Sequence, residues 1–163
     1  MADASPARKQ KEFGVTRIVD APRERVFEAW TDPDQLAKWW GPAGFSTPRS
    51  SVSIDARPGG KWTATMKSDG EDGTEVPFYG VYEELEAPAV LSFTLIDENH
   101  AEFDPDDPEK GAERVRVVFN DKDGEKTEIV FRQVGYLPDD QIEPSRQGWV
   151  SFFDCLADHL AKS

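Results

Sequence analysis

The stretch GWVSFFDCLADHLAK, residues 148–162, decides the fold. At 100° per residue its large apolar side chains fall within a narrow arc, while Asp154 and Asp158 lie on the opposite side of the helix. The members of this arc are Trp149, Phe152, Phe153, Leu156 and Leu160. A helix with one strongly apolar face has to bury it, so we expect a long C-terminal helix packed on a partner. Pro144 and Gly148 leave the first residue of this helix open.

The expected partner is a sheet, because the chain between residues 43 and 135 shows strand and turn signals with almost no helical periodicity. Apolar and polar side chains alternate in several segments, and turn residues such as Asp123-Gly124 separate them. With one strand before this region, the expected strands are residues 13–19, 51–54, 62–66, 78–85, 91–95, 115–119 and 127–131. Six of these strands, from residues 51–54 onward, are consecutive, and their connections are too short for crossovers, which predicts antiparallel pairing.

Two short helices follow the first strand. Pro22 stands at a first-turn position, Asp32 is a candidate cap, and Pro33 opens the second helix, which ends at Gly41-Pro42. The order of elements predicts an α+β fold, in which a curved antiparallel sheet of about six or seven strands wraps around the C-terminal helix. The space between the concave face and the helix is a candidate pocket.

Length and charge restrict the function. Residues 1–12 lack periodicity and are expected to be a flexible tail, and residues 13–163 are expected to form a single domain. The 32 Asp and Glu residues against 19 Lys and Arg give a net charge of -13, which argues against nucleic-acid partners and against anionic membranes. The single cysteine, and the absence of a long apolar run or a signal-like segment, make a cytoplasmic protein the expectation.

Four segments, taken in order, resemble the START-like or SRPBCC helix-grip superfamily. Within it the chain is most similar to the family named for the activator of the heat-shock-protein-ninety ATPase. The segments are VTRIVDAPRERVFEAWTDPDQLAKWWGP (15–42), DARPGGKW (55–62), GVYEELEAPAVLSF (80–93) and Gly148-Trp149. The resemblance implies a helix-grip fold and, from ligand-binding relatives, an apolar cavity under the helix. The acidic stretch 97–112 departs from the family, and we expect a stand-alone member without the cochaperone's additional N-terminal domain.

No catalytic or metal-binding pattern stands out. Cys155 precedes His159 by four residues, but no motif of a thiol enzyme surrounds them, so we prefer a half-buried cysteine beside a surface histidine. The stretch 97–112, which contains His100, has dense carboxylates interrupted by prolines and fails the spacing of an EF-hand. We therefore expect a solvated loop there, a turn at Gly59-Gly60, and neither a metal nor another cofactor.

Aromatic residues are the candidate binding residues, although filling of the core is the alternative for each one. The set expected to line a cavity is Trp40, Phe45, Trp62, Phe78, Tyr82, Phe93, Phe119, Phe131, Trp149 and Phe153. Its expected walls are partly Trp62, Phe93, Phe131 and Trp149. Arg17, Arg57 and Tyr82 are candidates for its polar contacts, with surface salt bridges as the alternative for both arginines.

Three functions follow from these observations. The first is a non-catalytic module that binds a hydrophobic or amphipathic small molecule. The second is an enzyme of the polyketide cyclase or aromatase kind, and the third is a chaperone-linked interaction protein in the stress response. An unpaired titratable group in the pocket favours the enzyme, a wholly apolar pocket favours the binding module, and a filled interior favours the interaction protein. Ligand identity and oligomeric state stay open.

Overall fold

The computed structural model describes residues 11–41, 44–71, 73–97, 103–107 and 112–162. Its strands are β1 (Lys11–Val19), β2 (Phe45–Ser46), β3 (Ser53–Ile54), β4 (Lys61–Ser68), β5 (Glu75–Glu86), β6 (Val90–Asp97), β7 (Glu113–Lys122) and β8 (Lys126–Gly135). Its helices are α1 (Arg23–Thr31), α2 (Pro33–Trp39) and α3 (Asp139–Lys162), with a 3-10 turn, η1, at Arg49–Ser51. No helix in this described part is long and apolar enough to cross a membrane.

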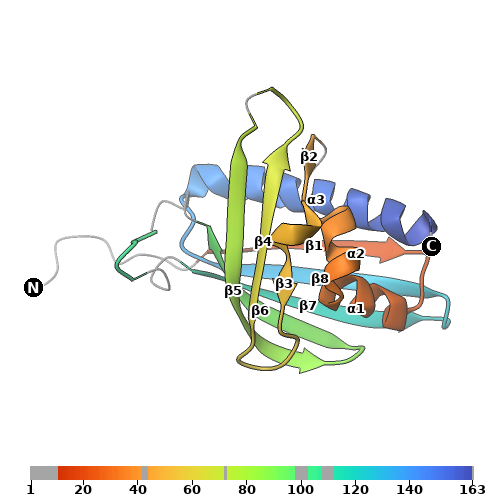
Figure 1. Ribbon diagram of the computed structural model, residues 1–163. Coiled ribbons are helices and arrows are strands. Elements are labelled where there is room, and N and C mark those ends of the chain that lie inside the picture. The colour runs from red at the N-terminus through yellow and green to blue at the C-terminus, as the bar shows by residue number, and fades with distance from the viewer. Residues whose placement is uncertain (1–10, 42–43, 72, 98–102, 108–111, 163) are drawn as a thin grey trace, which may run out of the picture.

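Within the described residues, eight antiparallel strands form one sheet in the order β1-β8-β7-β6-β5-β4-β2, and β3 also pairs with β4. Strands β4 and β5 cross α3, whereas β1 and β8 run alongside it (Figure 1). This architecture confirms the predicted α+β helix-grip fold. Strand β2 was not predicted, because two residues are too few to show an alternating pattern.

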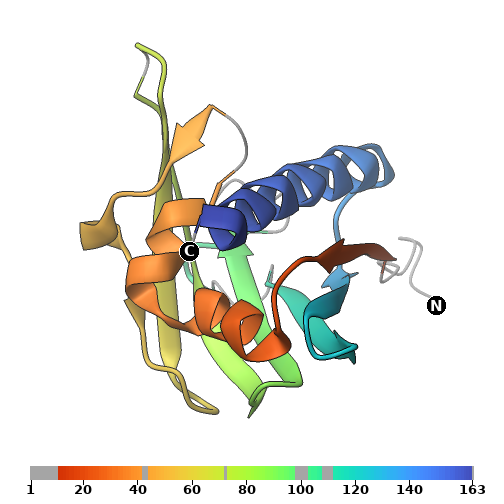
Figure 2. The same cartoon turned by 90° about the vertical axis from the view of Figure 1, so that its right-hand side faces the viewer.

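Helix α3 lies across the concave face of the curved sheet (Figure 2). Every residue of the predicted apolar arc is buried: Trp149, Phe152, Phe153, Leu156 and Leu160. The helix begins at Asp139, ten residues before the arc does, and it includes Pro144. The predicted long helix is confirmed. Its first turns, before Trp149, lack the apolar repeat, which is why the sequence leaves the start of the helix open.

Helices α1 and α2 lie beside the C-terminal end of α3 (Figure 2). The predicted cap is confirmed, since the Asp32 side chain accepts a hydrogen bond from the backbone N–H of Asp34 at 3.0 Å. The Arg25 guanidinium donates to the backbone carbonyl of Leu160 at 3.1 Å, and this bond ties α1 to the last turn of α3.

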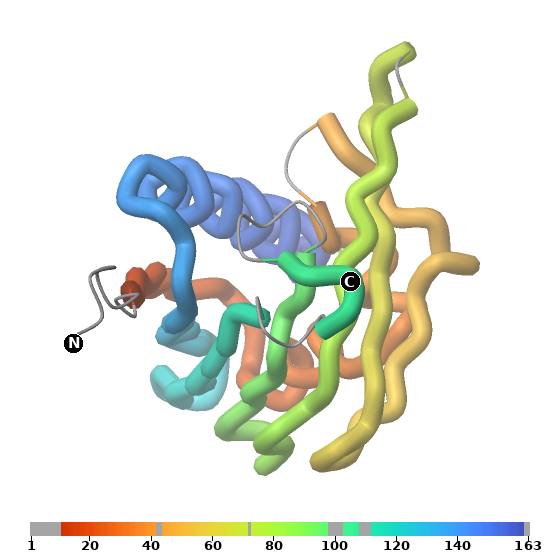
Figure 3. The backbone as a smooth tube through the Cα atoms, turned by 90° about the vertical axis from the view of Figure 1, so that its left-hand side faces the viewer, coloured from red at the N-terminus to blue at the C-terminus, as the bar shows by residue number. Residues whose placement is uncertain are grey.

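The structure moves one predicted boundary, between the N-terminal tail and the first strand. Strand β1 begins at Lys11, which pairs with Gly135, so the last two residues of the expected tail belong to the sheet. Residues 1–10 lie outside the described residues. In the stretch expected to be an acidic loop, residues 103–107 are described, and Figure 3 shows them beside strands β5 and β6. The remainder of that expectation, including His100, lies outside the described residues.

Candidate functional site

Aromatic rings fill the middle of the interior. The Trp62 ring lies 5.2 Å from that of Phe93 and 5.6 Å from that of Trp40, measured between centroids. The space left beside Trp62, Tyr82 and Phe93 is only about 10 Å³, barely enough for one water molecule. The Phe131 ring packs on Trp149 at 4.4 Å. The cavity expected between Trp62, Phe93, Phe131 and Trp149 is therefore not found at that place, because these rings pack closely against one another.

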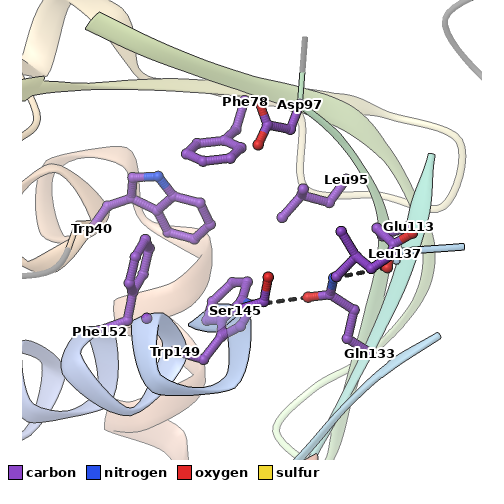
Figure 4. Close-up of a pocket in the computed structure, with 11 residues that line it drawn as sticks. Trp40, Phe78, Leu95, Asp97, Glu113, Gln133, Leu137, Ser145, Trp149 and Phe152 are labelled. Atoms are coloured by element: carbon purple, nitrogen blue, oxygen red, sulfur yellow. Dashed lines mark hydrogen bonds between the residues drawn. The ribbon is translucent and has the colours of Figure 1, made fainter. Parts of the chain in front are cut away.

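A larger hollow of about 150 Å³ lies toward the N-terminal half of α3 (Figure 4). We call it the α3 cavity. It is lined by the residue after α2, by strands β5 to β8, by the β8–α3 connection and by α3 itself. The lining residues are Trp40, Phe78, Leu95, Asp97, Glu113, Gln133, Leu137, Ser145, Gly148, Trp149 and Phe152.

One side of the α3 cavity consists of four aromatic residues. Trp40 is at their centre, with ring centroids 5.0 Å from Phe152, 5.7 Å from Trp149 and 6.0 Å from Phe78. All three ring pairs are edge-to-face, a geometry that adds stability beyond the area buried. These ring contacts connect the residue after α2 with β5 and α3.

The other side carries a buried polar network (Figure 4). The indole Nε1 of Trp149 donates to the amide oxygen of Gln133 at 2.8 Å, and the Gln133 amide nitrogen donates to Glu113 Oε1 at 2.9 Å. The backbone N–H of Tyr136 donates to Glu113 Oε2 at 2.9 Å. Glu113 is only 3% exposed, and both oxygens of its carboxyl group accept hydrogen bonds.

Gly135 leaves the room that the Glu113 carboxyl occupies. A Cβ atom at position 135 would lie 1.8 Å from Glu113 Oε2 and 2.1 Å from its Cδ. No real contact is that short, so the Glu113 carboxyl can occupy this position only because glycine at position 135 has no side chain. Gly148 differs, because a Cβ there would meet no heavy atom within 4 Å.

Asp97 is the second carboxyl at the α3 cavity. It is the cross-strand partner of Phe78, and Glu113 is the partner of Leu95, two residues before Asp97 on β6. Side chains two apart on a strand share a face, so both carboxyl groups lie on the face that lines the cavity. The eleven described residues of the lining include no Lys, Arg or His.

The five tryptophans differ in the partners of their indole nitrogens. Trp39 and Trp62 donate to the backbone carbonyls of Ala29 and Thr94 at 2.9 and 3.0 Å, and Trp149 donates to Gln133. Trp30 and Trp40 are buried, and neither indole nitrogen has an acceptor among the described residues. Burying an N–H group without an acceptor costs free energy, so Trp40 lines the cavity at a cost to the stability of the fold.

Of the predicted binding residues, Trp40, Phe78 and Trp149 line the α3 cavity. Phe119, Phe131 and Phe153 are buried in the core, and Phe45 is half-buried on β2. The arginines lie elsewhere, in the ion pairs that were their alternative. Arg17 contacts Asp154 of α3 at 2.5 Å. The Arg57 side chain is 74% exposed and contacts Asp55 at 2.9 Å.

The sequence analysis missed Phe152 and the polar half of the lining. Glu113 has the same parity as the inward-facing Val115 and Val117 on β7, and Gln133 has the parity of Phe131 on β8. The carboxyl and the amide therefore continue the inward-facing parity at the ends of two strand faces, Glu113 at the start of β7 and Gln133 near the end of β8.

Cys155 is half-buried, as expected. Burial, followed by the negative charges of Asp158 and Asp154, raises the pKa of its thiol, which disfavours the nucleophilic thiolate. The ring nitrogen Nε2 of His159 lies 3.1 Å from the side-chain oxygen of Gln35. The contact between His159 of α3 and Gln35 of α2 is therefore a structural one between two helices.

Comparisons with known proteins agree with this fold. A solved structure from Chromobacterium violaceum is 26% identical, with a TM-score of 0.76 over 91% of this chain and 96% of that chain. The AHSA1 protein of Silicibacter pomeroyi is 23% identical, with a TM-score of 0.75 over 93% and 98% of the two chains. A protein of unknown function from Staphylococcus aureus is 16% identical, with a TM-score of 0.70 over 94% and 95%.

The second and third of these likenesses show the fold alone. A search of the curated proteins found no match. The sequence model of one family, described as Activator of Hsp90 ATPase homolog 1-like protein, matches residues 20–161, which is most of the chain. Together with the helix-grip architecture, this match shows that the chain belongs to the Activator of Hsp90 ATPase homolog 1-like family.

Proposed function

We propose that this domain binds a small, largely apolar molecule in the α3 cavity without transforming it. The observation that carries the proposal is the contrast between the two interior spaces. The rings around Trp62 leave about 10 Å³, whereas a hollow of about 150 Å³ that opens to solvent lies beside Trp149. Because this hollow is open and bordered by aromatic rings, an apolar molecule seated there would remove apolar surface from water, which favours binding.

The volume sets the size of the molecule. An apolar cavity of about 150 Å³ holds benzene, and pockets for drug-sized ligands start at roughly 300 Å³. We therefore expect one ring or a short branched chain inside the cavity, with any larger part of the ligand extending outside. The hydrogen-bonded Gln133 and Glu113 would orient the polar end of such a molecule.

A second candidate function is catalysis of the cyclase kind, and one observation favours it. The cavity wall includes Glu113, a buried carboxyl of the type that enzymes use as a general base. Against this, both of its oxygens already accept hydrogen bonds from Gln133 and the backbone of Tyr136. For a chaperone contact, no observation on the described residues adds support.

Native mass spectrometry of the protein purified from its own host tests the binding proposal. We expect a retained small molecule on the wild-type protein. Gly148→Leu should fill the open space at the wall and abolish retention, whereas Gln147→Leu adds the same side chain at a neighbouring exposed position outside the lining and should not. Retention by Gly148→Leu would place the ligand elsewhere and refute the proposal.

A titration followed by NMR gives an independent readout. Trp40 and Trp149 line the cavity, whereas Trp39 does not. A ring-sized ligand, added to several millimolar, should therefore shift the indole signals of Trp40 and Trp149 and leave that of Trp39 in place. A ligand recovered with an altered mass after incubation would favour the enzyme over the binding module.

A further inference from the structure

We propose that the convex face of the sheet binds an acidic segment of a partner protein, through two arginines that lie opposite each other on β7 and β8. This face is turned away from the α3 cavity, so the inference does not depend on the proposed binding function. We call the site the convex arginine surface. It is a hollow whose lining includes Gly14, Thr16, Arg116, Val118, Val130 and Arg132.

The described helices leave this face of the sheet uncovered. The residues of the convex arginine surface on β7 and β8 alternate with buried residues that point inward. Helices α1 and α3 contact those inward residues: the ring of Phe27 lies 5.7 Å from that of Phe119, and the ring of Trp149 lies 4.4 Å from that of Phe131. The outward side chains are therefore accessible to a partner.

The arginine pair is the main feature of this surface. Arg116 and Arg132 are direct cross-strand partners, an arrangement of like charges that destabilises a sheet. The Nε of Arg116 donates to Glu84 Oε1 at 3.0 Å, and the Nε of Arg132 lies 3.5 Å from Glu12 Oε2. These two carboxylates stand on β5 and β1, on opposite sides of the β7–β8 pair, so they draw the guanidinium groups apart.

Both guanidinium groups keep donors for a further carboxylate. Among the described residues, Arg116 and Arg132 make their side-chain contacts through Nε alone. A guanidinium has five N–H donors in a planar fork, and its terminal nitrogens bind carboxylates in strong, charge-assisted hydrogen bonds. A carboxylate placed between the two arginines would also offset the repulsion between them.

An apolar floor lies beside the arginines. Val118 and Val130 are cross-strand partners, and each lies two residues from an arginine on its own strand, which places all four side chains on one face. Gly14, opposite Arg132, has no side chain to fill the hollow from β1. Ile18, on the same face of β1, is 56% exposed. The surface therefore fits a carboxylate and an apolar side chain about 7 Å apart, the rise of two residues along a strand.

The exposure of the site favours a protein segment over other anions. The side chains of Arg116 and Arg132 are 52% and 65% exposed, whereas sites for small molecules bury most of the ligand surface. The net charge of -13 opposes extended polyanions such as nucleic acids and anionic membranes. A short segment with one or two carboxylates is affected mainly by charges within the Debye length of about 8 Å at physiological salt, where it meets the arginine pair.

Two synthetic peptides test the inference. The acidic peptide is acetyl-Ser-Glu-Ser-Ile-Ser-amide, in which the carboxylate and the apolar side chain share one face of an extended chain. The neutral peptide has Gln in place of Glu. Each is added to several millimolar to the full-length protein while the backbone amide signals of Val118 and Val130 are followed by NMR. We expect the acidic peptide to shift both signals and to bind at least threefold more tightly than the neutral one.

Variants separate the arginine pair from the overall charge. Arg116→Gln combined with Arg132→Gln removes the pair, and Arg57→Gln combined with Arg146→Gln removes the same charge from two ion pairs elsewhere. We expect the first double variant to lose the preference for the acidic peptide and the second to retain it. If the first double variant loses the native spectrum, Arg116→Gln and Arg132→Gln are measured singly, and each should at least halve the preference.

The other outcomes overturn the inference. Equal binding of the two peptides would refute recognition of a carboxylate, and equal effects of the two double variants would assign the preference to net charge. If neither peptide shifts Val118 or Val130, the surface does not bind such a segment. Shifts at these residues with protein concentration alone would assign the surface to a second copy, and shifts with phosphatidylserine vesicles but not with peptide would assign it to a membrane.

Discussion

Substitution of glycine by alanine should have opposite effects on the stability of the protein at two positions, one in the wall of the α3 cavity and one beside it. Gly148 lies inside α3, and an added Cβ would meet no heavy atom within 4 Å. Alanine is better than glycine in a helix interior by about 0.8–1.0 kcal/mol. Gly148→Ala should therefore stabilise the protein by about that amount, which corresponds to a rise in Tm of roughly 2–4 °C for a chain of this size.

Gly135→Ala should destabilise the protein. The new Cβ would lie 1.8 Å from Glu113 Oε2, so the carboxyl has to leave its place. The donors on Gln133 and Tyr136 would then lose their acceptor. An unpaired buried donor costs about 1–3 kcal/mol, so we expect a total loss of roughly 2–4 kcal/mol. The corresponding fall in Tm is roughly 4–16 °C.

Urea melts and calorimetry of the two variants, measured beside the wild type, give both free energies under one set of conditions. A loss of stability in Gly148→Ala would mean that the wall of α3 is not open at this position. An unchanged stability in Gly135→Ala would mean that the Glu113 carboxyl is not held as described. Either result would remove the geometric basis of the α3 cavity.

Three further predictions concern the rest of the fold. Leu156→Ala, which truncates a fully buried side chain of α3, should cost about 2–5 kcal/mol in denaturant melts, and a loss below about 0.5 kcal/mol would contradict its place in the core. Because burial raises the pKa of the Cys155 thiol, iodoacetamide should modify the native protein at pH 8 more slowly than the urea-unfolded chain; equal rates would contradict this. The Arg116 guanidinium lowers the pKa of the Glu84 carboxyl below its usual 4.5, so its contribution to stability is present above the unfolded-state pKa and lost as the pH falls through the folded value. The decline of Tm in acid should accordingly be shallower in Arg116→Gln, and an identical slope would contradict the pairing.

The sequence was sufficient for the architecture because the relevant signals are local and repeated. The apolar arc of α3 and the Asp123-Gly124 hairpin each follow from a few neighbouring residues. In the hairpin, the φ angles of 60° at Asp123 and 75° at Gly124 are those of the tight turn that the dipeptide predicts. Strand β2 and the first turns of α3 carry no such period and depend on pairing with distant segments.

The location of the cavity depends on side-chain volumes summed over the whole interior. The alternation identified Trp62 and Phe93 as inward-facing, and both are buried. It did not indicate that their rings would pack at 5.2 Å and close the space between them. Glu113 was different, because its inward parity on β7 was readable. A polar residue with inward parity at the end of an apolar strand face, such as Glu113, is therefore a better marker of this site than the aromatic residues were.

The contact between β5 and β6 gives a last prediction, which tests the frame that holds the cavity. At Gly80 a Cβ would lie 1.9 Å from the backbone oxygen of Thr94, and backbone cannot yield as a side-chain end can. That oxygen also accepts a hydrogen bond from the Trp62 indole at 3.0 Å, and Thr94 Oγ1 accepts one from the backbone N–H of Val81 at 3.0 Å. Gly80→Ala should force the strands apart and cost about 2–4 kcal/mol, from overpacking and a lost hydrogen bond. Urea melts measure this cost, and the Trp62 indole signal should move in NMR spectra while that of Trp39, bonded to Ala29, stays in place. A cost below about 1 kcal/mol, or a fixed Trp62 signal, would show that β5 and β6 do not approach this closely.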